Sequence, residues 1–151
     1  MGILTSDMQQ VVDAELGFIA TVCPDGTPNL SPKGTIAVWD DDHLVFADIR
    51  SPGTVENLRR NPAIEVNVVD PLVRKGFRFK GVAALHTEGE AFESGIAFYE
   101  RRGTVKPRER IRTIVIIAVE RASAVTSPAY DLGETEDTLR TRYLQIYKDR
   151  A

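Results

Sequence analysis

The chain has one cysteine and two histidines among its 151 residues, so it cannot form an intramolecular disulfide or a typical Cys/His zinc site. Its longest unbroken apolar run covers residues 114–119, which is far too short to span a bilayer. No lysine or arginine precedes Lys33, so we expect no basic signal or transit peptide. Together these absences predict a cytoplasmic protein without a membrane partner.

The sequence also lacks an excess of positive charge. Lysine and arginine number 19 against 22 acidic residues, which gives a formal net charge of −3. This balance excludes a generally basic surface of the kind that coats nucleic acid. One basic run departs from it, and it contains no aromatic residue on which bases could stack. We therefore expect no nucleic-acid partner, and binding of an anionic polymer is the weakest of three functional hypotheses. The run consists of Arg101, Arg102, Lys106, Arg108, Arg110 and Arg112.

Apolar residues make up 42% of the chain and charged residues 27%, as in ordinary globular proteins. No repeat or linker divides the chain, so residues 1–151 are expected to form a single domain. The short turns between most strands favour a largely antiparallel sheet, and six strands with proline and glycine breaks suggest a small closed or nearly closed barrel. Strands are predicted at 18–23, 29–39, 44–48, 63–69, 77–87 and 111–119, and helices at 6–16, 51–61, 91–102 and 135–148.

The segment 46–57 is the first candidate for chemistry, because a predicted strand there leads directly into a predicted helix. The first amides of a helix lack internal partners and carry the positive end of the helix dipole. Gly53 lets an anion approach the backbone, and the Ser51 and Thr54 hydroxyls add donors, so a phosphate group is a suitable ligand. The simpler explanation is that Ser51 only caps the helix.

A second candidate lies on the predicted strand 29–39. Ser31 and Lys33 fall on the same face of this strand, and Pro32 and Gly34 indicate that the strand is interrupted beside a groove. In a groove Lys33 would pair with a phosphate or a developing negative charge, whereas on a solvent face it would be an ordinary surface lysine.

The strand at 77–87 supplies a third candidate. Arg78 and Lys80 lie on one of its faces, and Phe77 and Phe79 lie on the other. The two cations form either a wall beside an anionic ligand or a plain solvated face. No nucleophile elbow, zinc-protease helix or dinucleotide-binding glycine motif is found, so hydrolysis and a Rossmann fold are not supported.

Segments 17–22, 25–34, 44–48, 54–58 and 79–83, taken in order, resemble the pyridoxamine 5′-phosphate oxidase-like, FMN-binding split-barrel family. The resemblance covers about residues 16–90. It implies a mainly β (α+β) fold, a six-stranded antiparallel split β-barrel with flanking helices, that pairs into a homodimer with FMN at the subunit interface.

The resemblance also assigns roles to residues. Ser31, Lys33 and Gly34 would line the flavin ring edge and the ribityl chain. The strand end and the helix start would run beside the flavin and hold its phosphate, and the two cations of the strand at 77–87 would lie next to the cofactor. The remaining assigned residues are Phe46, Ala47, Asp48, Ile49, Arg50, Ser51, Thr54, Asn57, Arg78 and Lys80.

One position departs from the family pattern. Many relatives carry a lysine or arginine directly before the Thr54 equivalent, where this chain has Gly53. Arg50, or a basic residue elsewhere, would then replace that phosphate contact. The resemblance implies an FMN-dependent oxidoreductase that acts on an unidentified small molecule, with a reduced nicotinamide as a possible reductant and no metal or catalytic side chain required. The alternative is a flavin-, haem- or F420-binding protein without turnover of its own.

Overall fold

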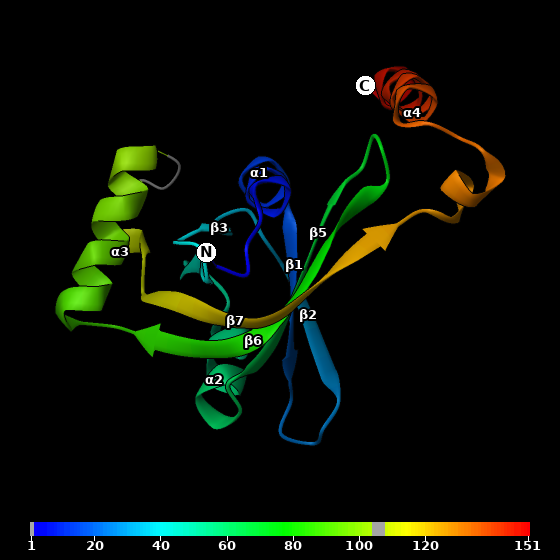
Figure 1. Ribbon diagram of the computed structural model, residues 1–151. Helices are drawn as coiled ribbons and strands as arrows, with labels where there is room; N and C mark the ends of the chain where they lie inside the picture. The colour runs from blue at the N-terminus through cyan, green and yellow to red at the C-terminus, as the bar shows by residue number, and fades with distance from the viewer. Residues whose placement is uncertain (1, 104–107) are drawn as a thin grey trace.

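The computed structural model describes residues 2–103 and 108–151 (Figure 1). The order of helices and strands predicted from the sequence is confirmed, except that the second predicted strand is divided in two. In chain order the elements are α1 (Ser6–Ala14), β1 (Gly17–Val22), β2 (Pro28–Lys33), β3 (Ala37–Val38), β4 (His43–Asp48), α2 (Pro52–Arg60), β5 (Ala63–Asp70), β6 (Lys75–His86), α3 (Gly89–Arg102), a 3-10 helix η1 (Arg108–Arg110), β7 (Thr113–Thr126), a second 3-10 helix η2 (Pro128–Leu132) and α4 (Glu136–Arg150).

All seven strands of the described residues belong to one antiparallel sheet with the order β2-β1-β5-β6-β7-β4-β3. Its two edge strands, β2 and β3, follow one another in the chain and are joined only by residues 34–36. So short a connection can span roughly 14 Å at most. The sheet must therefore curl until its edges come together, which makes a barrel with a seam between β2 and β3.

The expected count of six strands is wrong by one, because the strand predicted at 29–39 ends at the seam and resumes beyond it. Pro32 lies inside β2, opposite Phe18 of β1. A proline cannot donate a hydrogen bond to a neighbouring strand, and an edge strand is where a sheet tolerates it. Lys33 is the last residue of β2, so it lies directly at the seam.

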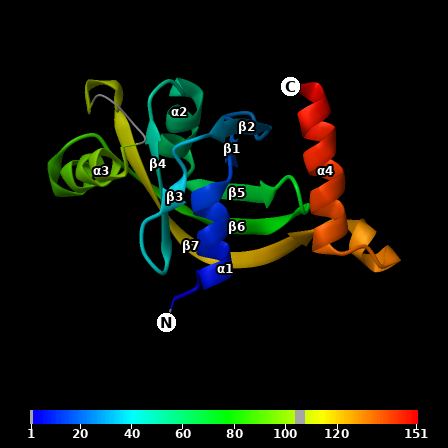
Figure 2. The ribbon, with the colours of Figure 1, turned by 90° about the horizontal axis from the view of Figure 1, so that it is seen from above.

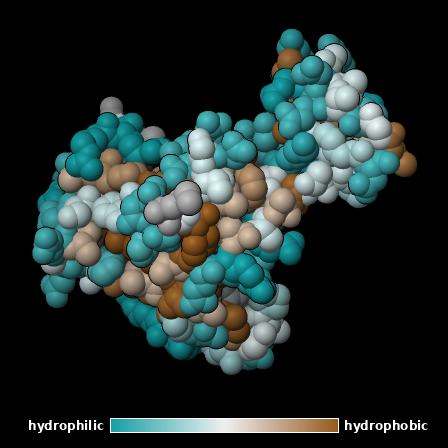
Figure 3. Space-filling view, in the orientation of Figure 1, coloured by the Kyte–Doolittle hydropathy of each residue, from teal (hydrophilic) through white to brown (hydrophobic). Residues whose placement is uncertain are grey.

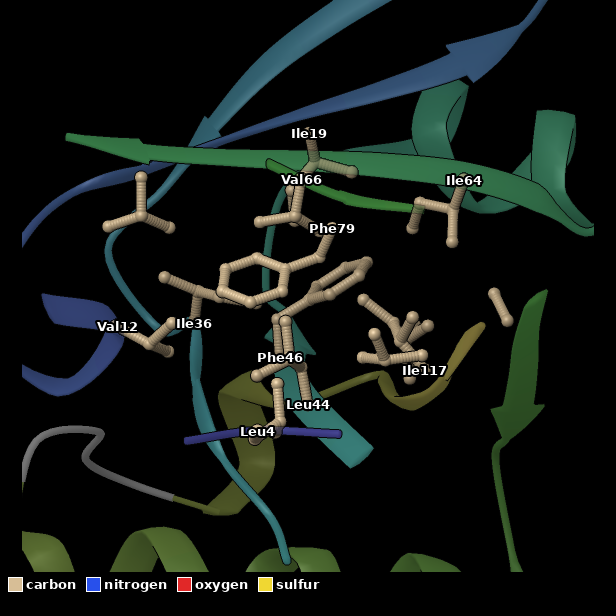
Figure 4. Packing of buried hydrophobic residues seen from close by; sticks show 14 of the residues in the cluster. Leu4, Val12, Ile19, Ile36, Leu44, Phe46, Ile64, Val66, Phe79 and Ile117 are labelled. Carbon is tan, nitrogen blue, oxygen red and sulfur yellow. The ribbon is translucent and has the colours of Figure 1, made fainter. Parts of the chain in front are cut away.

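The inner face of the curled sheet forms the larger of two hydrophobic clusters. Every second residue of the strands points inward, and Phe46 and Phe79 lie fully buried among branched aliphatic side chains (Figure 4). Helix α1 covers this cluster with Val12, and Leu4 packs beside it. The barrel interior is therefore a packed core, and a ligand has to bind at its surface.

A smaller cluster lies on the outer face of β4 and β7, beneath α3. Ile114 and Ile96 are buried there, together with Tyr99, whose hydroxyl donates to the Thr35 carbonyl at 2.6 Å. Helix α3 approaches β7 closely at Gly95, where an added Cβ would lie 2.6 Å from Ile114 Cγ2. Strand β7 is thus buried on both faces at this end, which explains its continuous apolar sequence.

The C-terminal segment 127–151, which we call the C-terminal arm, projects from the barrel at the end opposite α3 (Figures 1 and 2). It contains η2 and α4, and it forms a mostly hydrophilic projection in the space-filling view (Figure 3). Within the described ranges, no helix has both the length and the apolar character needed to cross a membrane.

Candidate functional site

Lys33 is the central residue of the candidate site. Its side chain lies on the inner side of the seam, and the residue is only 6% exposed. The ammonium group donates to the Ser31 hydroxyl at 2.7 Å and to the Ser51 hydroxyl at 2.5 Å. Burial lowers the pKa of Lys33, and the nearby Asp48 carboxylate partly offsets this shift. The structure therefore brings together Ser31, Lys33 and Ser51, three of the residues expected at the cofactor site.

Ser51 is the N-cap residue of α2, but its side chain makes no capping hydrogen bond. It accepts from Lys33 instead, so capping alone does not explain this serine. The first amide of the helix to reach a backbone acceptor is that of Val55, which donates to the Ser51 carbonyl at 3.2 Å. The Gly53 and Thr54 amides come before it, so they remain for another acceptor. An anion at this helix start would meet free amides and a positive dipole end.

Asp48 closes β4 just before this turn. It is 4% exposed, and its carboxylate accepts from the Ser51 amide at 2.9 Å. This bond fixes the path of the chain from β4 into α2, and it holds Asp48 on the same inner side of the sheet as Lys33. The Lys33 ammonium has no carboxylate oxygen within ion-pair distance in the described part of the chain, so its charge is only partly compensated.

A hollow of about 570 Å³ opens at the start of α2. Its floor is the turn from β4 into the helix, and its wall is the beginning of β7. Gly53 faces open space, since an added Cβ would meet no atom within 4 Å. The lining residues are Asp48, Pro52, Gly53, Val55, Glu56, Arg59, Thr87, Arg112 and Thr113. Sequence reasoning missed Thr87, Arg112 and Thr113 at this place, because only the long-range pairing of β7 with β4 and β6 brings them here.

Other residues predicted for the site face elsewhere. The Phe46 side chain lies in the inner core, and Ala47 and Ile49 belong to the cluster beneath α3, so only their backbone can run beside a ligand. Thr54 is buried. The Asn57 amide is engaged inside the protein, where it donates to the Thr21 hydroxyl at 3.1 Å.

Gly34 and Arg50 lie at the edges of the site. Gly34 lines a second, smaller hollow of about 240 Å³ at the seam, beside Leu16 and Ile36. Arg50 is exposed and does not line the hollow at the start of α2. Gly34 is therefore open to a ligand near the seam, whereas Arg50 lies at the surface outside the hollow.

Arg78 and Lys80 lie on the outer face of the sheet, opposite to the face that carries Lys33. The register shows this directly, because Arg78 pairs with Asn67, which pairs with Phe18, and all three alternate with buried inner residues. Both cations are exposed and bind Glu65, Arg78 at 3.0 Å and Lys80 at 3.6 Å. Within one chain they cannot join the site at Lys33.

The basic run is partly neutralised by acidic neighbours. Arg108 pairs with Glu93 and Glu100, and Arg102 lies 3.6 Å from Asp13. Lys106, which also belongs to the run, lies outside the described residues. Two members of the run that the structure describes, Arg102 and Arg108, therefore lie beside acidic partners.

Comparison with known proteins decides the family. A family model described as pyridoxamine 5′-phosphate oxidase matches residues 4–126, which is most of the chain and the whole of the barrel. The chain belongs to the pyridoxamine 5′-phosphate oxidase family. The match ends where β7 ends, so the C-terminal arm lies outside it.

Individual relatives give the same picture. The chain is 30% identical over 89 residues to an uncharacterized protein of Methanocaldococcus jannaschii, MJ0282, a match that covers 58% of this chain and spans about three fifths (59%) of the length of that relative. HupZ of group A Streptococcus is 29% identical with a TM-score of 0.71, over 82% of this chain and 98% of HupZ. An FMN-binding protein of Syntrophomonas wolfei shares the fold, with a TM-score of 0.69 at 16% identity over 82% of this chain and 87% of that protein.

Proposed function

We propose that this protein is an FMN-dependent oxidoreductase that acts on a small molecule, and that two copies hold the cofactor between them. The single observation that carries the proposal is Lys33, a buried cation at the start of α2 in a chain of this family. A cation that is removed from water and lacks an ion-pair partner is costly unless a ligand supplies negative charge. FMN supplies such charge in its phosphate and, when reduced, in its ring.

The donors at the helix start fit a phosphorylated ligand. The Gly53 and Thr54 amides and the Ser51 hydroxyl would hold the phosphate, and the open space beside Gly53 admits it. Lys33, with Ser31 and Gly34 beside it on the seam, would lie along the flavin ring and the ribityl chain. The proposed binding of FMN therefore depends on hydrogen-bond donors that this chain provides at the start of α2 and at the neighbouring seam.

Bound FMN would supply the transfer of a hydride or of electrons, for which the lysine, serine and aspartate side chains of this site have no suitable group. The contribution of the chain is electrostatic. Lys33, fixed by two hydroxyl partners, would place a positive charge where the reduced ring carries negative charge, and this favours the reduced form. The packed interior beneath the site keeps water away from that side of Lys33, which strengthens the interaction.

A second copy of the chain would bring Arg78 and Lys80 to the cofactor. These cations lie on the outer face of the sheet, and the same face leaves Phe18, Leu30 and Val82 exposed, Leu30 to 65%. Exposed apolar side chains that share one face of a sheet are typical of an interaction surface. Pairing of two such faces would bury them and place the cations of one copy near the site of the other.

A spectrum of the purified protein tests the proposal. We expect either a yellow protein as isolated or an apoprotein that binds added FMN in a titration, and bleaching of the bound flavin by a reductant such as reduced nicotinamide. Sedimentation or light scattering should report a dimer. A colourless monomer that fails to bind FMN would refute the assignment.

Replacing Lys33 with methionine tests its assigned role. Lys33→Met should lower the reduction potential of bound FMN, because it removes the charge that stabilises the reduced ring. Lys148→Met, on the exposed surface of α4, is the matched control and should leave the potential unchanged. Equal potentials in the wild type and Lys33→Met would mean that Lys33 does not face the ring.

A flavin-, haem- or F420-binding protein without turnover is the second candidate. It is favoured by the burial of Lys33 and Asp48, whose polar atoms are already engaged with Ser31 and Ser51. Such a protein would show the colour of its cofactor but no substrate-dependent bleaching, and its absorption spectrum would identify the cofactor. With one cysteine available, we propose the cytoplasm as the site of action for either candidate.

A further inference from the structure

We propose that Arg112 binds the phosphate group of the cofactor and makes the site prefer FMN to riboflavin. This inference rests on the proposed function, because it assigns a residue to the same cofactor site. Arg112 comes from the beginning of β7, a part of the chain that is 59 positions away from Gly53 in sequence but lines the same hollow.

The backbone holds Arg112 firmly at this place. Its amide donates to the Asp48 carbonyl at 3.0 Å, and the next residue, Thr113, pairs with Asp48 in the β4–β7 register. Asp48 is also the residue whose carboxylate fixes the Ser51 amide. One residue of β4 therefore ties the backbone of Arg112 to the start of α2, and Arg112 and Gly53 line the same hollow.

The charges that line the hollow leave Arg112 as the available cation. Glu56 pairs with Arg59 at 3.5 Å and with Arg60 at 3.4 Å, so both of these arginines already have an acidic partner. The Asp48 carboxylate is buried and bonded to the Ser51 amide. Across the described residues, Arg112 forms no ion pair.

The buried ammonium of Lys33 is an independent sign that this place takes an anion. Lys33 reaches Ser51 from the inner side of the seam, and Arg112 reaches the same helix start from the hollow. An anion at the Gly53 amide would then lie beside Arg112 in the hollow and two residues from Ser51, whose hydroxyl accepts from Lys33. A guanidinium offers paired donors that match phosphate oxygens, whereas the riboflavin hydroxyl in that position gains little from it.

The test is a titration of four apoproteins with FMN and with riboflavin, followed by flavin fluorescence. The proteins are the wild type, Arg112→Gln, Arg112→Lys and Arg50→Gln. We expect Arg112→Gln to weaken FMN binding by about 10- to 100-fold while riboflavin binding stays unchanged, because only FMN loses a charge-assisted hydrogen bond. Arg112→Lys should recover part of the loss, and Arg50→Gln should behave like the wild type.

Each result decides between the alternatives. Equal losses for both flavins in Arg112→Gln, or a selective loss of FMN in Arg50→Gln, would overturn the assignment of Arg112. A wild-type protein that binds FMN and riboflavin equally would show a flavin site without a phosphate contact, which overturns this inference and leaves the proposed function standing. A wild-type protein that binds neither flavin would overturn both. The backbone bond to Asp48 is retained in every variant, and circular dichroism confirms that each variant is folded.

Discussion

The barrel and the C-terminal arm are stabilised in different ways. The barrel buries two clusters of apolar side chains on the two faces of its sheet. The arm buries one side chain of α4, Leu139, and leaves Leu132 88% exposed. Its structure depends on local bonds: Ser127 and Thr135 cap its two helices, and Thr135 and Thr138 form a reciprocal capping box. The barrel is thus stabilised mainly by buried apolar side chains, and the C-terminal arm mainly by short-range polar contacts.

The arm is nonetheless fixed to the barrel at its base. The Tyr130 hydroxyl donates to the Val73 carbonyl at 2.6 Å, and the Lys75 ammonium lies 4.2 Å from the centre of the Tyr130 ring. Arg74, which adopts a positive φ of 57° in the β5–β6 turn, stacks 3.9 Å from the centre of the Tyr143 ring. These contacts all reach one turn of the barrel, so the arm has one point of attachment.

The largest expected effect concerns the barrel. Phe79→Ala should lower the free energy of unfolding by about 3–5 kcal/mol, because it leaves a cavity in the middle of the inner cluster. Urea denaturation followed by circular dichroism measures the loss. Leu132→Ala in the arm is the control and should change stability by less than about 0.5 kcal/mol. Similar losses in both variants would contradict the distinction between the two parts.

A smaller effect, confined to the arm, is expected for Leu139→Ala. Removing this buried side chain should cost about 2 kcal/mol, because it leaves a cavity where the arm has its one fully buried large residue on α4. Hydrogen exchange should speed up in α4 and remain slow in β5 and β6. Faster exchange throughout the sheet would show that the arm and the barrel unfold as one unit.

The cap of α4 should matter less still. Thr135→Ala removes the acceptor of the Thr138 amide and half of the capping box, which should cost about 1 kcal/mol of helix stability. Hydrogen exchange of the first turn of α4 measures it. Thr141→Ala, on an exposed position in the same helix, is the matched control, and an equal effect there would argue against the cap as the cause.

The smallest effect is a pH dependence where the two parts face each other. A hollow of about 620 Å³ separates α1 from α4, and burial and the Asp70 charge raise the pKa of Glu15 there, against an opposing effect of Arg140. Because the pKa of Glu15 is raised in the native state, its protonated carboxyl stabilises the fold at pH values below the ordinary pKa of 4.5. This contribution to stability is lost as the pH rises through the native pKa.

An NMR titration of the Glu15 carboxyl tests this coupling. Arg140→Gln should raise its pKa further, since the one cation that lowers it is removed. Glu15→Gln should abolish its share of the pH dependence. An unchanged Glu15 pKa in Arg140→Gln would mean that the charge of Arg140 on the arm does not act on the Glu15 carboxyl.

The sequence predicts most of the fold because its signals are local. The helix predicted from Ser51 has this residue at its N-cap, and Phe77 and Phe79 alternate with Arg78 and Lys80 along β6 as predicted. The division of the second strand was visible as an interruption at Pro32 and Gly34, but the closing of the barrel at that point follows only from the strand order. A seam is a long-range property, and no short segment specifies it.

For the candidate site, too, the residues marked by local sequence signals could be predicted, and those placed by long-range contacts could not. Ser31, Lys33 and Ser51 were indicated by a strand break and a helix start, and the structure brings them together. Asn57 illustrates the limit, because its spacing on α2 says nothing about Thr21, which takes its amide. Arg112 illustrates it from the other side, since only the pairing of β4 with β7 shows that a residue of the basic run lines the hollow at α2.

The distribution of aromatic residues has a practical consequence. The single tryptophan, Trp39, stacks 5.4 Å from Phe98 at the α3 end, whereas three of the four tyrosines, Tyr130, Tyr143 and Tyr147, belong to the segment 127–151. Excitation at the long-wavelength edge, where only tryptophan absorbs, therefore reports events around α3. Tyrosine emission reports mainly on the C-terminal arm, so the two kinds of emission distinguish changes at opposite ends of one molecule without an added label.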